Sequence, residues 1–442
     1  MRILLRAPMS PLDNYSAEDL LKKDRFGVNV GNLVYQYSVY RMLYNDENTI
    51  EADGLIMDPN RADWINENFD MYILPFADAF RPDFRKYLTL YTRLFNKLKI
   101  PICILGIGIR APYEPDFSDS FVFDDEVRAF MDAALEKSSI VGLRGNLTGK
   151  YLSKLGYIED KHFLSIGCPS MYTFGRHLSI KKLNLTKESK ISLNGTQGMS
   201  EKTMDYLYKT SKDYHNHVFV PQVWPEMVLG YLGGPSVSHS AESYPFSIDS
   251  DFYKEGKVKF FLNAQTWFQY MQNRDFSFGT RLHGNITATI NGTPSLTIAS
   301  DARVRELVEF HKLPSFSLKE FNDSLIELPL SEIVKKVDLS SSETVHNENF
   351  SNYISFLERN NIRGNFSIDP NRKFCPLDDE LSKINFNKPV ESIISISDSD
   401  KVKRLSFGLD WYKHKKQKEV TIEKEKYTVL NKKIQDIKKI IN

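Results

Sequence analysis

The stretch FGTRLHGNITATINGTPSLTIASD, residues 278–301, predicts a strand, a tight turn, a short helix and a second strand. Phe276 and Phe278 alternate as the side chains of a buried strand do, and a glycine follows them. Ile286 and Ile290 lie four residues apart, which places both on one face of a helix that an Asn-Gly pair ends. A buried strand that leads into a helix of small residues is typical of an open α/β sheet.

Two side chains with ionic chemistry stand in the turn between this strand and this helix. Arg281 can bind a phosphate or a carboxylate through two parallel hydrogen bonds, and His283 can donate a proton near neutral pH. The backbone amides of Gly284 and Asn285 open the helix, where its dipole favours an anion. The turn is therefore predicted to bind an anion; the alternative is a solvated arginine beside a capping histidine.

The rest of the chain repeats the alternation of strand and helix in two series. This pattern predicts two α/β lobes, each with a parallel sheet, that face a cleft. Strands are expected at residues 2–7, 71–75, 102–106, 139–143 and 162–166, and then at 189–195, 216–221, 257–263, 275–279 and 294–299. The expected boundaries are 1–175 for the first lobe, 176–330 for the second, 331–400 for a return helix with a loop region, and 401–442 for a helical tail.

Charge is distributed unevenly along the chain. Residues 401–442 hold 13 Lys and Arg against 5 Asp and Glu, although the whole chain has a net charge of only +1. An apolar seam runs along this tail at alternating spacings of three and four: Tyr427, Leu430, Ile434, Ile437 and Ile441. The tail is predicted to contact an anionic membrane surface or a second copy of the chain; a solvated helical extension is the alternative.

The composition is that of a soluble globular protein, with 41% hydrophobic and 26% charged residues in a chain of 442. Three cysteines without a CxxC spacing argue against a disulfide framework and against a structural zinc site. No window approaches 18 apolar residues, so a membrane-spanning helix is not expected. We expect a cytoplasmic protein with no bound metal and no nucleic-acid partner.

Several segments resemble, in order, the motifs of the polysaccharide pyruvyl transferase family. The resemblance covers about residues 1–315 and includes the R-L-H-G turn at Arg281. The other matching segments are GVNVGNLVY (27–35), ILGIGIR (104–110), IVGLRGNLTGKYLSKLGY (140–157), IGCPSMYTF (166–174) and ARVRELVEF (302–310). The resemblance implies a GT-B-like arrangement of the two lobes.

Members of this family transfer the enolpyruvyl unit of phosphoenolpyruvate onto two hydroxyls of a sugar, which forms a cyclic ketal and releases phosphate. The resemblance thus implies phosphoenolpyruvate as co-substrate, no further cofactor, and a saccharide acceptor, free or lipid-linked, in bacterial surface or capsular polysaccharide biosynthesis. His283 is then the general acid, and Arg281 and Arg144 are cationic contacts of the donor. A salt-bridged arginine that packs the first lobe is the alternative for Arg144.

Three residues are predicted to contact the acceptor. Asn29 and Asn32 open the first helix of the first lobe, where helix capping is the alternative role. Trp224 offers a flat apolar face to a sugar ring, and core packing is its alternative role.

One loop departs from the family pattern. Many members have a glycine-rich turn after the strand at residues 71–75, but here the segment is PFADAFRPDF, without a glycine. Asp78 and Arg81 in this segment are expected to be solvated surface residues. Cys168 is expected to be a structural cysteine, with no histidine paired to it.

Two other functions compete with this interpretation. A nucleotide-sugar glycosyltransferase would share the two-lobed fold but would also need a pocket for a base and a ribose. A non-catalytic glycan-binding protein would bind saccharide but not phosphoenolpyruvate.

Overall fold

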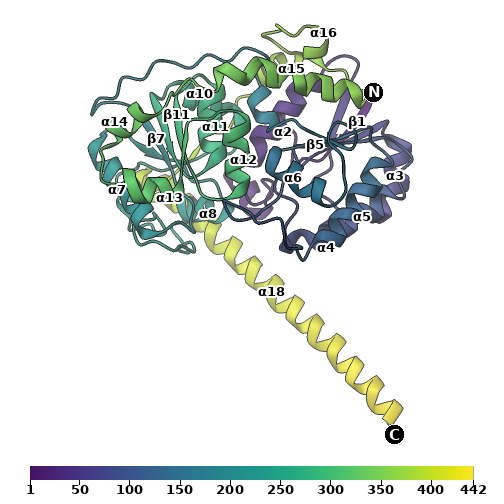
Figure 1. Ribbon diagram of the computed structural model, residues 1–442. Coiled ribbons are helices and arrows are strands. Elements are labelled where there is room, and N and C mark those ends of the chain that lie inside the picture. The colour runs from purple at the N-terminus through teal and green to yellow at the C-terminus, as the bar shows by residue number, and fades with distance from the viewer. Residues whose placement is uncertain (442) are drawn as a thin grey trace.

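The computed structural model describes residues 1–441 and contains two α/β lobes side by side, with the last helix projecting away from them (Figure 1). The sheet of the first lobe has the strand order β2-β1-β3-β4, and all three neighbouring pairs are parallel. A parallel pair, β5 and β6, continues it through a bridge between Ile107 and Leu143. The strands are β1 (Arg2–Leu5), β2 (Thr49–Ala52), β3 (Met71–Pro75), β4 (Ile102–Leu105), β5 (Val141–Leu143) and β6 (Phe163–Ser165). The helices are α1 (Ala17–Lys22), α2 (Gly31–Leu43), α3 (Ala62–Asn68), α4 (Arg85–Phe95), α5 (Asp124–Leu135) and α6 (Asn146–Lys154).

The sheet of the second lobe has the order β12-β11-β10-β7-β8, again with all neighbours parallel. Its strands are β7 (Ile191–Asn194), β8 (Val218–Phe219), β10 (Phe276–Gly279), β11 (Ser295–Ala299) and β12 (Ser315–Ser317). The helices are α7 (Glu201–Asp213), α8 (Trp224–Leu232), α9 (Asp251–Lys254), α10 (Ala264–Gln272), α11 (Leu282–Ile290), α12 (Ala302–Phe310), α13 (Leu318–Glu320) and α14 (Leu330–Ile333). The predicted α/β class with two parallel-sheet lobes is confirmed.

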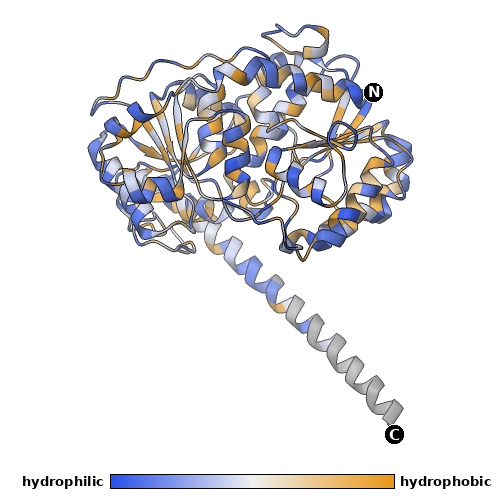
Figure 2. Cartoon of the chain, in the orientation of Figure 1, coloured by the Kyte–Doolittle hydropathy of each residue, from blue (hydrophilic) through white to orange (hydrophobic). Residues whose placement is uncertain are grey.

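The central strands are short apolar runs because helices cover the sheets on both faces. Every residue of β3, β10 and β11 is buried, which is the pattern of a strand covered on both sides. In α4 the buried residues Leu88, Tyr91 and Leu94 recur every three residues and form the stripe that faces the sheet. Figure 2 shows the apolar residues concentrated within the two lobes.

Helix α2 joins the two lobes. It contacts β3 in the first lobe and α10 and α11 in the second, and all its residues except Asn32 are buried. Its first residue, Gly31, lies against the second lobe so closely that an added Cβ would stand 2.9 Å from the Cβ of His283. The glycine therefore permits the close approach of α2 and α11 at the cleft.

The chain returns to the first lobe after the second is complete. Tyr353 of α15 (Glu343–Arg359) stacks on Tyr172 with ring centroids 4.8 Å apart. At the end of the same helix, the Nδ2 of Asn360 donates to the carbonyl of Ile140, 3.1 Å away. The return helix thus packs against the first lobe.

The region predicted as a loop contains regular structure. It includes α16 (Asn365–Ile368), α17 (Pro376–Ser382) and β13 (Val390–Glu391). β13 pairs antiparallel with β9 (Lys259–Phe260), a segment that the sequence placed in the second parallel series. A parallel bridge between Phe219 and Val258 is the link from this small ladder to the main sheet.

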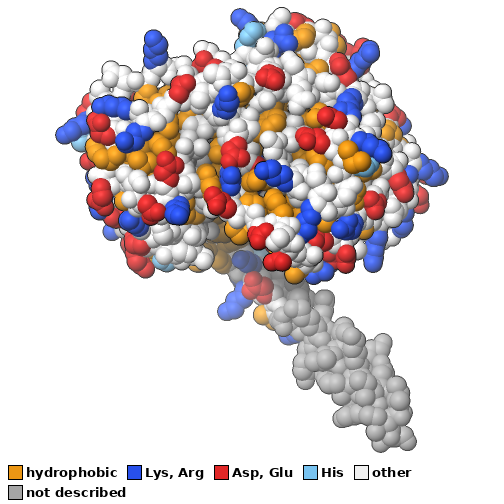
Figure 3. All heavy atoms as spheres, viewed as in Figure 1, with side chains coloured by type: hydrophobic (Ala, Val, Ile, Leu, Met, Phe, Trp, Pro, Cys, Tyr) orange, Lys and Arg blue, Asp and Glu red, His pale blue; other side chains and the backbone are white. Residues whose placement is uncertain are grey.

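Helix α18 (Asp398–Ile441) begins against the body and then leaves it (Figure 1). The indole of Trp411 donates to the carbonyl of Leu21 at 3.1 Å, and the hydroxyl of Tyr412 donates to the carbonyl of Gly234 at 3.0 Å. The side chains of the predicted seam from Tyr427 to Ile441 lie outside the described part of the chain. Within residues 1–441, no helix combines the length and apolar character that crossing a membrane requires. On the visible face of the body, basic and acidic side chains are interspersed (Figure 3).

Candidate active site

The carboxyl ends of strands from both lobes meet at a cleft of about 390 Å³. Arg6 follows β1, Arg144 follows β5 and His283 follows β10, and all three side chains line this cleft. Ligands bind at this edge of open parallel sheets because the strands diverge there and the following helices point their N-termini at it. The predicted cleft is thus lined by residues of both lobes.

The lining is strongly cationic. Within the described chain, it contains five arginines and a single carboxylate, that of Asp78. The arginines are Arg6, Arg81, Arg110, Arg144 and Arg303. Since guanidinium groups bind phosphate and carboxylate through paired hydrogen bonds, this surface suits a small ligand with more than one anionic group.

The loop expected to be solvated instead forms one wall of the cleft, so that prediction is wrong. Asp78 is only 6% exposed, because Arg110 donates from Nε to its Oδ2 at 2.6 Å and Arg81 donates from Nη1 to its backbone carbonyl at 2.7 Å. Burial opposes ionisation of Asp78, but Arg303, Arg110 and Arg81 outweigh it and lower the pKa of the carboxyl. Asp78 is therefore an anion that holds the wall together.

Arg144 and Arg303 approach the cleft from opposite lobes. Arg144 is 3% exposed, and its Nε has no hydrogen-bond partner within residues 1–441. In Arg303 one Nη lies 3.3 Å from Asp301, and the buried Nε likewise lacks a partner in the described structure. Both guanidiniums consequently keep donors available for an added anion.

His283 stands at the second position of α11, between the two lobes. Its Nε2 lies 3.9 Å from the Sγ of Cys168, and its ring centroid lies 5.9 Å from that of Tyr35. Burial first, and then the charges of Arg144 and Arg303, lower the pKa of His283 to about 3. The imidazole is therefore neutral at physiological pH in the ligand-free protein. Cys168 is buried as expected, but a histidine does lie beside it.

Arg281 leaves the turn on the other side, away from the lining of this cleft. Its Nε donates to the carbonyl of Gly195 at 2.8 Å, and its Nη2 lies 4.0 Å from the buried carboxylate of Glu226. Burial lowers the pKa of Arg281, an effect that Glu226 opposes. The structure thus places Arg281 behind the turn, where it supports the site rather than facing the cleft.

The amides of Gly284 and Asn285 are already paired. Both donate to the carbonyl of Arg281, at 3.0 and 3.3 Å, so the helix leaves the amides of Leu282 and His283 for an anion instead. The side chain of Asn285 is fully occupied by the surrounding strands and is 1% exposed. The amides of Gly284 and Asn285 were predicted to contact a bound anion. This prediction needs correction, because α11 begins at Leu282 and both amides are hydrogen-bonded at its start.

The three residues predicted to contact the acceptor line two different pockets. Asn29 and Asn32 line the cleft, where the Nδ2 of Asn32 donates to the carbonyl of Phe26 at 2.8 Å and so fixes the loop before α2. Trp224 lines a different, apolar pocket beside α18.

Sequence reasoning missed Arg6, Arg110 and Arg303. Each is the first basic residue after the end of a strand, although the strand predicted at residues 2–7 had included Arg6. Because parallel strands end at one edge, that position was a usable signal.

A family model for polysaccharide pyruvyl transferase matches residues 15–302. The chain belongs to this family. No functionally curated protein matches the chain. Similar solved structures include the UDP-GlcNAc 2-epimerase of Neisseria meningitidis bound to UDP-GlcNAc, at 10% identity and a TM-score of 0.44, which covers 81% of this chain and 100% of that chain. Another is a functionally uncharacterized protein of Klebsiella pneumoniae, at 13% identity and a TM-score of 0.36, with coverages of 70% and 87%.

The depressed pKa of His283 gives a first prediction. In the ligand-free protein its NMR signals should report a neutral ring down to about pH 4, and an anion bound in the cleft should raise the pKa. In the unfolded chain a histidine has a pKa of about 6.5. The free energy of unfolding should therefore decrease as the pH falls from about 6.5 toward 3, because only the unfolded state then binds a proton at this residue. The NMR signals that disappear in the variant His283→Gln identify those of the His283 ring. Titration near 6.5 without ligand would contradict the prediction.

A second prediction concerns Arg303. Arg303→Gln should weaken the binding of a small phosphate-bearing anion by roughly 10- to 100-fold, because a charged hydrogen-bond donor is worth about 1.5–3 kcal/mol. The matched control is Arg305→Gln on the same helix, since Arg305 pairs with Glu309 at 2.7 Å outside the cleft. Calorimetry of both variants measures the effect, and equal affinities for the anion would show that Arg303 does not bind it.

Proposed function

We propose that the protein transfers the enolpyruvyl group of phosphoenolpyruvate onto two hydroxyls of a saccharide and forms a pyruvate ketal. The observation that carries this proposal is the cleft in which five arginines face a neutral histidine. Family membership supports a transferase that acts on polysaccharide. Phosphoenolpyruvate is a compact donor with a phosphate and a carboxylate, which is the ligand chemistry that this lining favours.

The donor lies between the lobes in this proposal. Its phosphate contacts Arg144, Arg303 and the free amides that open α11, while its carboxylate lies toward Arg81 and Arg110. The two lobes contribute opposite sides of the donor site, so closure of the lobes around the donor would exclude water from the reaction.

The reaction needs one proton on the methylene carbon of the donor. His283 delivers it after the bound anion has raised its pKa, and a sugar oxygen then attacks the neighbouring carbon. Phosphate departs when the second hydroxyl closes the ketal. Of the two hydroxyl protons, one returns to His283 in place of the proton that it gave to the new methyl group, and the other leaves with the phosphate. Asn29 and Asn32 are placed to contact the acceptor at the rim of the cleft.

The test of this function is phosphate release with saccharide acceptors beside donor binding. His283→Gln should lower kcat by roughly 10²- to 10⁴-fold, the contribution of a general acid, while donor affinity changes little. Phosphoenolpyruvate should raise Tm, and nucleotide sugars should not. Protection by nucleotide sugars alone would favour a glycosyltransferase, and a near-normal kcat of His283→Gln would exclude proton transfer by this residue.

We also propose that α18 contacts an anionic membrane surface from the cytoplasmic side. Its exposed apolar residues Val402, Leu405, Leu409 and Tyr412 are spaced three and four apart and form one stripe. Lysines flank that stripe, and each basic residue near such a surface contributes about 1 kcal/mol of attraction. An interfacial helix, rather than a spanning one, fits this arrangement.

Deletion of residues 417–442 tests whether the distal basic part of α18 adds to the membrane contact, since the stripe from Val402 to Tyr412 stays in place. The deletion removes 7 basic and 4 acidic residues together with the apolar seam. It should weaken binding to anionic liposomes at low salt and leave turnover of soluble acceptors intact, because salt screens such attraction. If liposome binding and oligomeric mass both stay unchanged, this part of the tail has neither role.

A further inference from the structure

The elements that line the catalytic cleft differ in charge. Most of its cationic side chains follow strands of the first lobe or belong to α12: Arg81, Arg110, Arg144 and Arg303. Helix α2 lines the same cleft with uncharged groups, those of Asn32, Tyr35 and Gln36. These three residues are spaced three and four apart and therefore share one face of the helix. The cleft is thus cationic where the strands end and neutral along α2.

Arg6, the remaining arginine of the lining, does not alter this division. Its Nε donates to the hydroxyl of Tyr91 at 2.8 Å, and its Nη1 donates to the carbonyl of Pro75 at 3.0 Å. The central carbon of its guanidinium also lies 4.5 Å from the ring centroid of Phe76. These contacts fix Arg6 to β3 and α4 of its own lobe.

Gln36 is the residue of this neutral face whose hydrogen bonds are not made. It is only 2% exposed, yet neither its Nε2 nor its Oε1 has a hydrogen-bond partner within residues 1–441. An amide that loses its bonds to water on burial without gaining new ones is unfavourable for the fold. Because nearly all buried polar groups are paired, an unpaired one at a cleft indicates a ligand that supplies the partners.

The two asparagines beside Gln36 are more fully used by the fold. The Nδ2 of Asn32 donates to two carbonyls of the loop before α2, at 2.8 and 3.0 Å. The Oδ1 of Asn29 accepts from the amide of Gly31 at 2.8 Å. These bonds shape the loop, whereas Gln36 keeps both a donor and an acceptor for another molecule.

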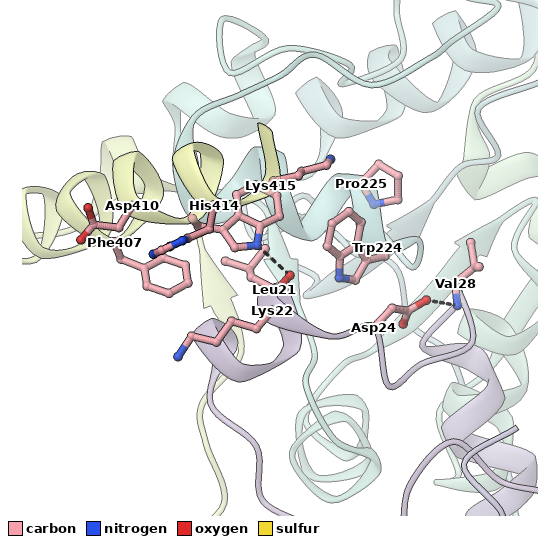
Figure 4. A pocket seen from close by; sticks show the side chains of 11 residues that line it. Leu21, Lys22, Asp24, Val28, Trp224, Pro225, Phe407, Asp410, His414 and Lys415 are labelled. Carbon is pink, nitrogen blue, oxygen red and sulfur yellow. Dashed lines mark hydrogen bonds between the residues drawn. The ribbon is translucent and has the colours of Figure 1, made fainter. Parts of the chain in front are cut away.

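Trp224, the third residue predicted to contact the acceptor, does not line the cleft. It lies beside Pro225 in the apolar pocket at the base of α18 (Figure 4). Its indole N–H donates to the carbonyl of Leu20 at 2.9 Å. The recognition of a saccharide in the cleft is therefore left to other side chains.

An amide with both polar atoms free matches a hydroxyl better than an anion. Oxygens of a phosphate or an ionised carboxylate only accept, so they would pair with Nε2 and leave Oε1 beside negative charge. A sugar hydroxyl both donates and accepts, and two neighbouring hydroxyls can satisfy both atoms of one amide. The anion finds its partners on the arginines instead.

We propose that Gln36 determines the specificity of the cleft for its saccharide. Its Nε2 donates to one hydroxyl and its Oε1 accepts from a neighbouring hydroxyl, while an anionic ligand lies toward the arginines. Only the identification of this saccharide with the acceptor rests on the proposed transferase function.

A small cavity of about 10 Å³ next to Gln36 supplies a matched control. Gln265 lines this cavity together with Gln36 but does not line the cleft, and its Nε2 and Oε1 likewise lack partners in the described chain. A cavity of this size holds about one water molecule. If both amides only held a water there, the replacement of either one would have the same effect.

The test compares Gln36→Met with Gln265→Met in the full chain, since methionine is also unbranched and removes both hydrogen-bonding atoms. The sugar probes are the methyl glycosides of glucose, galactose and mannose, which differ in the orientation of neighbouring hydroxyls. The anion probe is phosphoglycolate, which carries a phosphate and a carboxylate but no enol. Saturation-transfer NMR titrations measure the sugars, and calorimetry measures phosphoglycolate.

Gln36→Met should weaken the binding of the preferred glycoside by roughly 5- to 100-fold, because two hydrogen bonds are lost. The affinity for phosphoglycolate should change by less than about twofold, since the arginines are untouched. Gln265→Met should change neither affinity. The Tm of Gln36→Met should equal or exceed that of the parent, because the variant removes an unpaired buried amide.

Four results would overturn the inference. They are the absence of binding by all three glycosides, equal losses of sugar affinity in the two variants, a loss of phosphoglycolate affinity in Gln36→Met as large as the loss for the sugar, and a Tm of Gln36→Met well below that of the parent. The second result would indicate a bound water only, and the fourth a structural role.

The proposed function is tested separately by phosphate release from phosphoenolpyruvate with the same glycosides. Sugar binding that depends on Gln36, without any phosphate release, would refute the transferase function and leave the sugar contact standing. Phosphate release that Gln36→Met leaves unchanged would support the transferase function and overturn the role of Gln36.

Discussion

The gathering of cationic side chains at the carboxyl ends of the strands is the constraint on which the candidate site depends. Five arginines line the cleft together with one carboxylate, and like charges that share a cleft repel one another. The fold offsets part of this repulsion internally: Asp78 pairs with Arg110, and Arg6 donates to the carbonyl of Pro75 at 3.0 Å. Arg303 pairs through one Nη with Asp301, but the Nε donors of Arg144 and Arg303 are left without a partner in the described chain. The cationic lining of the cleft is therefore a consequence of where the strands end.

The packing of the two lobes against each other sets the distance between the guanidinium groups of Arg144 and Arg303. Glu306 of α12 is 1% exposed and accepts from the hydroxyl and the amide of Thr148, at 2.8 and 3.1 Å, at the N-terminus of α6. Burial raises the pKa of Glu306 to about 7, although Arg144 opposes this. Glu306 follows Arg303 by three residues on the same helix, so the contact that fixes α12 against the first lobe also fixes Arg303 opposite Arg144. Gly108 makes room for it, because a Cβ there would stand 2.7 Å from the carboxylate.

The sequence predicts the sheets better than it predicts the site. Apolar runs located the central strands, because burial on both faces of a sheet leaves a strong sequence pattern. The pattern does not say which strand pairs with which. For that reason β9 was assigned to the parallel sheet, although it pairs antiparallel with β13. The loop region predicted within residues 331–400 contains α16 and α17, which the sequence does not reveal because they are only 4 and 7 residues long. In the site, His283 was found from its place after a strand and Arg144 from the resemblance to the family, and both line the cleft. Arg281 also follows a strand, but its side chain does not line the cleft. The direction in which a side chain leaves a turn depends on partners distant in sequence, here Gly195 and Glu226.

The low pKa of His283 does not conflict with a role as general acid; it makes that role conditional on the donor. Raising the pKa from about 3 to near 7 requires about 5 kcal/mol of favourable interaction with the protonated ring. At about 4 kcal/mol per unit charge at close range, a phosphate with a charge near −2 supplies enough. Arg144 and Arg303 lower the pKa in the free protein, and the anion that they bind neutralises that effect. In the proposed reaction, the same two arginines therefore keep the ring neutral without the donor and bring in the charge that protonates it.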